Sequence, residues 1–148
     1  MTRIQKILVP VDFSDHSAKA MEMAVDWAKQ FGAKIRLLHC YEIRPVGVTT
    51  YEMPVPEDYQ IEIRKTASRQ LQAWLEKVKA EGIEADATLS PCFAKVAIAD
   101  IAERDRSDLI IMGTRGRTGL KHIVLGSVAE RTLRTAPCPV CIVRASDT

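Results

Sequence analysis

Glycines frame one segment in the last third of the sequence. Gly113 and Gly116 lie three residues apart after a short apolar run, and nine residues separate Gly116 from the pair Gly126 and Ser127. Because glycine has no Cβ, its backbone N–H can turn toward a ligand, and the N–H groups at a helix N-terminus favour anions. This spacing predicts a loop that binds a phosphate chain.

Polar side chains of the same segment fit this chemistry. Ser127 can supply both a helix cap and a hydroxyl donor, and Arg115, Arg117 and Lys121 supply positive charge. The alternative interpretation is a surface turn whose charges are solvated. The position of the loop, after a buried strand and before a serine-capped helix, favours anion binding.

The loop lies within a regular alternation of strands and helices. Apolar, β-branched runs predict five strands, at residues 4–11, 35–40, 83–89, 108–113 and 139–143. Helical spacing predicts four helices: one between residues 15 and 32, and others at 57–82, 93–104 and 127–134. Residues 44–56 contain three prolines and a glycine, which predicts a long loop.

This alternation predicts the fold class. Strands joined through helices need right-handed crossovers and a parallel sheet covered on both faces, so we expect a three-layer α/β sandwich. Ligands of such sheets bind beyond the carboxyl ends of the strands, where the winding direction changes. The loop after the first strand, at Asp12, and the loop after Gly113 compete for that position. The length of 148 residues predicts a single domain, 1–148.

Composition excludes several classes of partner. Lys and Arg total 21 against 19 Asp and Glu, a net charge of +2, so charge gives no reason to expect nucleic-acid or membrane binding. No apolar run approaches the roughly 18 residues of a membrane span, and the first residues lack the apolar segment of a secretion signal. We expect a cytoplasmic protein with no nucleic-acid and no membrane partner.

The cysteines and histidines form no catalytic motif. Cys138 and Cys141 stand three apart on a predicted strand and point to opposite faces, which favours a structural role over a redox pair or half of a zinc site. His16, His39 and His122 are scattered, and we expect His39 to be a hydrogen-bonded core residue. No Gly-x4-Gly-Lys-Ser/Thr string occurs, and no glycine fingerprint of a dinucleotide fold follows the first strand.

A longer pattern carries a family resemblance. The motif Gly113-x2-Gly116-x9-Gly126-Ser127-x-Ala129 resembles the nucleotide-binding signature of the universal stress protein family. The resemblance extends to residues 9–14, 17–28 and 136–140, so it spans nearly the whole chain. It implies an adenine nucleotide alpha-hydrolase-like (Rossmann-like) fold with a five-stranded parallel sheet of order 3-2-1-4-5.

The resemblance also implies a binding site for ATP, or for another adenine nucleotide, with Mg²⁺. It makes the end of the first strand a wall of the adenosine pocket, places Cys40 against the base, and assigns the phosphates to the glycine loop. Asp12 has an alternative role as a cap or turn former. The implied nucleotide-binding residues are Pro10, Val11, Asp12, Cys40, Met112, Gly113, Arg115, Gly116, Arg117, Gly119, Gly126, Ser127 and Val128.

Two principal functions follow. The favoured hypothesis is an ATP-binding module of the stress response whose nucleotide state alters a surface or an oligomer. The alternative is a slow ATP-hydrolysing enzyme that uses the same pocket, and a redox protein that uses Cys138 and Cys141 is a third hypothesis. The last strand is expected at a sheet edge, where exposed backbone invites pairing, and the resemblance implies a homodimer through this strand.

Overall fold

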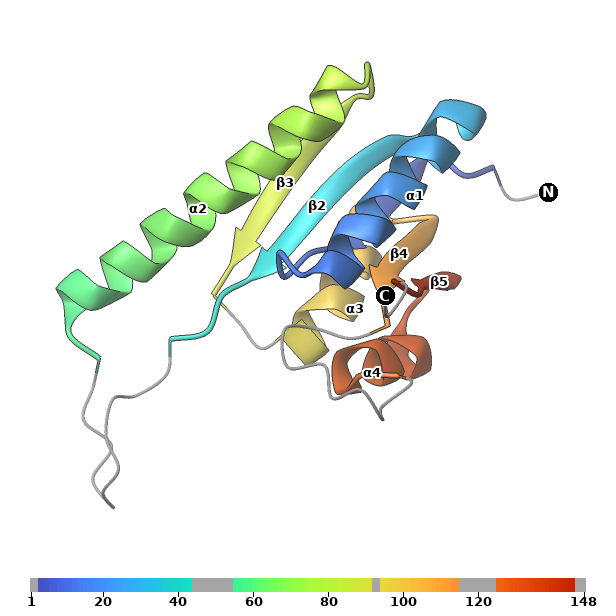
Figure 1. The fold of residues 1–148 in the computed structure, drawn as a ribbon. Coiled ribbons are helices and arrows are strands. Elements are labelled where there is room, and N and C mark those ends of the chain that lie inside the picture. Colours follow the sequence, from blue (N-terminus) through green and yellow to red (C-terminus); the bar gives the residue numbers. More distant parts are fainter. Residues whose placement is uncertain (1–2, 44–54, 92–93, 115–124, 146–148) are drawn as a thin grey trace.

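Five parallel strands form one sheet with helices on both faces (Figure 1). The computed structural model describes residues 3–43, 55–91, 94–114 and 125–145. The elements are β1 (Lys6–Pro10), α1 (Asp15–Phe31), β2 (Lys34–Cys40), α2 (Glu57–Ala80), β3 (Ala85–Ser90), α3 (Ala94–Asp105), β4 (Leu109–Gly113), α4 (Ser127–Thr135) and β5 (Val140–Val143). The predicted loop at 44–56 lies outside the described residues as far as residue 54.

The strand order confirms the predicted fold class. The sheet runs β3-β2-β1-β4-β5, and each neighbouring pair is parallel. The chain winds outward from β1 to β2 and β3, then crosses to β4 on the other side of β1. The winding direction therefore changes between β1 and β4, and the carboxyl ends of these two strands mark the switch point of the sheet.

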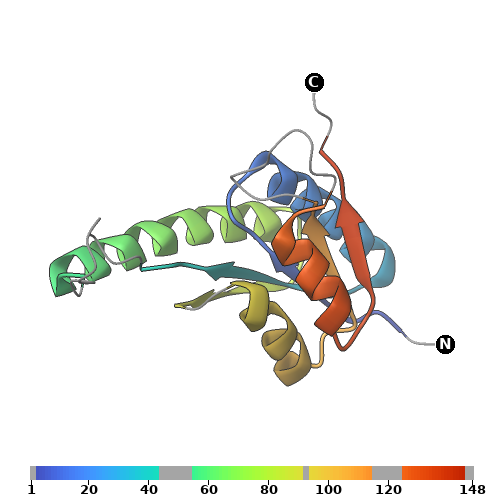
Figure 2. The same cartoon turned by 90° about the horizontal axis from the view of Figure 1, so that it is seen from below.

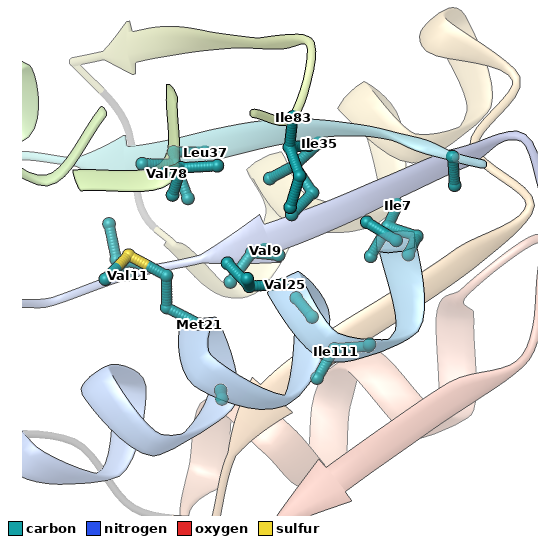
Figure 3. Packing of buried hydrophobic residues seen from close by; sticks show 14 of the residues in the cluster. Ile7, Val9, Val11, Met21, Val25, Ile35, Leu37, Val78, Ile83 and Ile111 are labelled. Atoms are coloured by element: carbon teal, nitrogen blue, oxygen red, sulfur yellow. The ribbon is translucent and has the colours of Figure 1, made fainter. Parts of the chain in front are cut away.

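Alternating side chains of the strands build a core on each face of the sheet. Ile7 and Val9 of β1 pack with α1 and α2, whereas Leu8 between them packs with α3 and α4. Figure 3 shows the first of these layers, in which Val25 of α1 and Val78 of α2 lie over the strands. Burial on both faces explains why the central strands are continuous apolar runs.

The ends of α1 are set by local chemistry. Ser14 has extended backbone, and its hydroxyl accepts a hydrogen bond from the N–H of Ser17, so Ser14 is the N-cap. Gly32 has φ +67° and donates its N–H to the carbonyl of Ala28, which ends the helix in the left-handed conformation that glycine favours. Both ends confirm the predicted start and stop.

The helix α2 extends beyond the sheet. None of residues 57–66 is buried, and its buried residues begin further along the helix, at Ala67, Leu71, Leu75 and Val78. Figure 2 shows this first part of α2 projecting past the strands. One face of this projecting half therefore lies over the carboxyl end of β2 without being buried. None of the helices in the described ranges is long and apolar enough to cross a membrane.

Ion pairs hold the opposite, amino-terminal part of the sheet. Arg36 of β2 stands beside Asp86 of β3 and makes two bonds to its carboxylate, at 2.7 and 2.8 Å. A third nitrogen of Arg36 lies 2.6 Å from Oδ2 of Asp105, at the end of α3. The guanidinium of Arg36 lowers the pKa of Asp86 below its ordinary value. These charges tie β2, β3 and α3 together.

Candidate functional site

A tight turn carries the chain from β1 into α1. Oδ1 of Asp12 accepts hydrogen bonds from the N–H of Ser14 and from the hydroxyl of Ser17, both at 3.0 Å. Asp12 therefore has the turn-forming role that the sequence left open as an alternative. The same bonds fix its carboxylate at the carboxyl end of β1, beside the switch point of the sheet.

Aromatic rings hold this turn in an unusual conformation. Phe13 has φ +66°, which is uncommon for a bulky residue. Its ring centroid lies 4.4 Å from that of His39 and 5.3 Å from that of Trp74. The predicted hydrogen bond of His39 is confirmed, because Nδ1 lies 2.8 Å from the carbonyl oxygen of Val11, but the residue is half-buried and not part of the core. Sequence reasoning missed Phe13 and Trp74, since one stands in a turn and the other has the spacing of an ordinary core residue.

A cavity of 640 Å³ lies between this turn, the end of β2 and the projecting half of α2. Asp12 and Cys40, both predicted site residues, line it together. The other lining residues are His39, Tyr41, Glu42, Tyr59, Glu62, Ile63, Thr66, Ala67 and Gln70. The last six recur at helical spacing on α2, a contribution that the family pattern did not include. Carboxylates and no Lys or Arg line the cavity within the described residues, so it suits an uncharged hydrogen-bonding group.

The N-terminus of α4 lies at the same edge of the sheet. Gly126 has φ −72° and ψ 162°, the extended backbone of an N-cap, and makes no side-chain cap. The prediction that Ser127 caps the helix is wrong, because Ser127 is the first helical residue. Its exposed hydroxyl is not engaged in capping. The first intrahelical bond runs from Glu130 to Gly126, so the N–H groups of residues 127–129 have no partner within the helix.

The backbone of Gly126 already has a partner. Its N–H donates a bond of 2.6 Å to the carbonyl oxygen of Thr114, the residue that follows β4. This corrects the expectation that Gly126 supplies an N–H to the phosphates. The donors left for an anion at this helix are the N–H groups of residues 127–129, together with the Ser127 hydroxyl.

Gly113 is required for packing. A Cβ at this position would lie 2.7 Å from Cβ of His16 and 2.8 Å from its carbonyl carbon, so only glycine lets the start of α1 approach the end of β4. Met112 and Val11 are buried in the two core layers, at 5% and 4% exposure, and offer no side chain to a ligand. Pro10 is half-buried at the end of β1.

Several residues of the predicted phosphate-binding loop lie outside the described part of the chain. They are Arg115, Gly116, Arg117, Gly119, Lys121 and His122. Within the described ranges, no group of three His, Cys, Asp or Glu side chains is placed to hold a metal ion.

The two C-terminal cysteines lie on opposite faces, as predicted. Cys138 packs with the α3 and α4 layer, and Cys141 packs with the α1 and α2 layer. Sγ of Cys141 lies 3.9 Å from Sδ of Met23. Burial raises the pKa of both thiols above the ordinary value, which keeps them in the weakly reactive protonated form near neutral pH.

Comparison with known proteins identifies the family. The model of the Universal stress protein family matches residues 3–144. The chain belongs to the universal stress protein family. Universal stress protein MJ0531 of Methanocaldococcus jannaschii is 36% identical over 145 residues, covering 95% of this chain and 82% of that protein. Universal stress protein YxiE of Bacillus subtilis is 35% identical, covering 94% of this chain and 98% of that protein.

Solved structures of the universal stress protein family share the fold. The structure of MJ0577, another protein of Methanocaldococcus jannaschii, matches with a TM-score of 0.86 at 26% identity, covering 99% of this chain and 100% of that chain. Two universal stress proteins, each 22% identical, match with TM-scores of 0.73 and 0.66 and cover 98% and 96% of this chain and 100% and 99% of theirs. The first was solved in complex with cAMP, and the second, from Archaeoglobus fulgidus, with dAMP.

Proposed function

We propose that this universal stress protein binds ATP and acts as a nucleotide-dependent regulatory module of the stress response. The observation that carries the proposal is the arrangement of two unlike subsites on either side of the β1–β4 switch point. A cavity lined by Asp12 and Cys40 lies on one side, and the N-terminus of α4, with Ser127 and Val128, lies on the other. A nucleotide has the same polarity, with a neutral base at one end and anionic phosphates at the other.

The charges of the subsites set the orientation. The carboxylates of the cavity repel phosphate, and the exocyclic amine of adenine is a donor that such acceptors can bind. The helix terminus offers N–H donors and the positive end of its dipole to an anion. The nucleotide therefore binds with its base under α2 and its phosphates at α4. The cAMP and dAMP complexes of two proteins with this fold support an adenine nucleotide as the ligand.

The remaining predicted residues complete the phosphate subsite. Thr114 and Gly126 bracket residues 115–125, so the ends of this segment meet at the start of α4. Arg115, Gly116, Arg117 and Gly119 belong to the segment and would add charge and backbone donors there. Mg²⁺, which prefers phosphate oxygens with few protein ligands, would bind with the nucleotide and offset the charge of its phosphates.

The hydrogen bonds of Asp12 favour a regulatory module over an ATPase. Its Oδ1 already accepts two hydrogen bonds from the β1–α1 turn. These bonds give the carboxylate a structural role and make it less suited to act as a general base that abstracts a proton. Purified protein should release about one adenine nucleotide per chain on denaturation, identified by mass spectrometry. Phosphate release at about 1 per second or faster would favour the enzyme instead.

A direct binding experiment uses the two tryptophans. Trp74 stacks edge-on against Phe13 beside the cavity, whereas Trp27 contacts Phe31 at the far end of α1. In a Trp27→Phe variant, ATP should change the fluorescence of Trp74. In a Trp74→Phe variant, the remaining Trp27 should not respond. A folded protein that shows no fluorescence change, and no heat of binding in calorimetry, would reject the proposed nucleotide function.

A homodimer through β5 is part of the proposal. β5 is an edge strand, and Pro139 and Val143 accept hydrogen bonds from Ile110 and Thr114 on the β4 side. Because backbone groups alternate along a strand, those of Val140 and Ile142 point away from β4. Antiparallel pairing with a second copy would satisfy these groups around a two-fold axis.

A further inference from the structure

Thr114 joins three elements of the structure. Its N–H donates to the carbonyl of Val143 in β5 at 3.1 Å, and its carbonyl oxygen accepts from the N–H of Gly126 at 2.6 Å. Its hydroxyl lies 3.3 Å from Nδ1 of His16, the second residue of α1. Thr114 is 4% exposed, so water does not replace these partners readily.

These partners belong to the two halves of the proposed site. The helix α1 follows the turn of Asp12, which borders the cavity for the base. Gly126 is the N-cap of α4, whose first N–H groups face the phosphates in the proposed orientation. Hydrogen bonds through Thr114 therefore connect the base half to the phosphate half.

The α1 end of this connection is closely packed. The backbone of His16 lies so near Gly113 that a Cβ there would approach its carbonyl oxygen to 2.9 Å. The start of α1 is therefore packed closely against the end of β4, and the imidazole of His16 reaches the Thr114 side chain from this packed position. The two residues lie 98 positions apart in the sequence, so their contact is a product of the fold.

We infer that Thr114 is a positioning residue, held by His16, that sets the distance between the base subsite and the N-terminus of α4. The inference rests on the proposed nucleotide function. It predicts that the contact affects only ligands that span both halves. ATP reaches from the cavity to α4, whereas adenosine occupies the cavity alone.

The test compares ATP with adenosine by calorimetry. Thr114→Val keeps the size of the side chain, removes the hydroxyl and preserves both backbone bonds. We expect its affinity for ATP to fall about tenfold and its affinity for adenosine to change less than about twofold, since one hydrogen bond is worth up to roughly a factor of ten. His16→Leu, which removes the other partner of the same bond, should have the same selective effect.

Conservative variants and a matched control separate positioning from loss of stability. Thr114→Ser retains the hydroxyl and His16→Asn retains a hydrogen-bonding side chain, so both should restore most of the ATP affinity. Thr132→Val removes another buried hydroxyl, which bonds to the carbonyl of Val128 within α4 at 2.8 Å. It should lower the melting temperature and leave the ratio of ATP to adenosine affinity unchanged.

The outcomes are distinct. If the folded Thr114→Val protein binds ATP as the natural chain does, or loses ATP and adenosine affinity equally, the positioning role is wrong while the nucleotide function stands. If the natural chain binds neither ligand, the proposed function fails and the positioning role fails with it. A selective loss of ATP affinity, restored by Thr114→Ser, supports the inference.

Discussion

Nδ1 of His39 lies 2.8 Å from the carbonyl oxygen of Val11. The N–H of Val11 also donates to the carbonyl of Leu38 at 2.8 Å, so both polar backbone groups of Val11 bond to β2. A carbonyl only accepts, so Nδ1 of His39 carries the proton. The His39 side chain thus extends the hydrogen bonding between β1 and β2 to Val11, the residue before Asp12.

His39→Leu should weaken this link between β1 and β2 and so destabilise the fold. It removes the donor to Val11 and the ring that packs on Phe13, so we expect a loss of about 1 to 2 kcal/mol in the free energy of unfolding. Urea denaturation measures the loss. His39→Asn keeps a side-chain donor without the ring and should recover part of the stability. Equal stability of the Leu variant and the natural chain would show that the bond contributes nothing.

Ser127→Ala tests the corrected role of Ser127. Because Gly126 is the N-cap and the Ser127 hydroxyl makes no capping bond, the variant should melt within about 1 °C of the natural chain. Loss of a hydroxyl donor to phosphate should still weaken ATP binding by about 1 kcal/mol. Calorimetry and a thermal melt on the same samples separate the two effects. A clear drop in melting temperature with unchanged ATP affinity would restore the capping role.

The periodic part of the structure was predictable from the sequence. Strands and helices were placed within about two residues because a helix that buries one face and a strand that is buried on both faces each leave a local pattern of apolar residues. The edge position of β5 agrees with the strand order that the family resemblance implies. Cys138 and Cys141 do pack in opposite layers, but Cys138 precedes β5, so alternation along a strand does not explain its position.

The contacts that shape the candidate site were not predictable in this way. Ser and Gly both serve at N-caps, so the sequence alone did not decide between Gly126 and Ser127. Phe13 has a positive φ, and its ring packs against rings from β2 and α2, which are distant in the sequence. Thr114 and His16 meet across 98 residues, and no local pattern encodes such a contact.

Asp86 should make the free energy of unfolding depend on pH. Arg36 lowers the pKa of Asp86 in the folded chain, so this carboxylate contributes stability above its unfolded pKa of about 3.9 and loses it as pH falls through the lower folded value. Asp86→Asn should therefore be less stable than the natural chain at pH 7. The difference should shrink as pH falls below about 4 toward the lower folded pKa, because the natural carboxyl is progressively protonated over this range.

Urea denaturation at pH 7, 5 and 3 measures this dependence. Glu84→Gln is the matched control, since Glu84, directly before β3, pairs with Lys34 of β2 but its side chain is 72% exposed. It should change stability little at any of these pH values. A difference between Asp86→Asn and the natural chain that grows toward pH 3 would contradict the role given to Arg36.

Val140→Pro should separate dimer formation from folding. The backbone N–H of Val140 points away from β4, so proline at this position removes no hydrogen bond of the β4–β5 ladder. It does remove a donor that a second copy would use, and its ring obstructs an approaching strand. We expect the natural chain to be a dimer at micromolar concentration and the variant to be a folded monomer, measured by sedimentation equilibrium and circular dichroism.

Cys141→Pro is the control, because the N–H of Cys141 points toward β4 and its loss should destabilise the fold itself. A natural chain that remains monomeric with or without ATP would show that the edge of β5 does not pair.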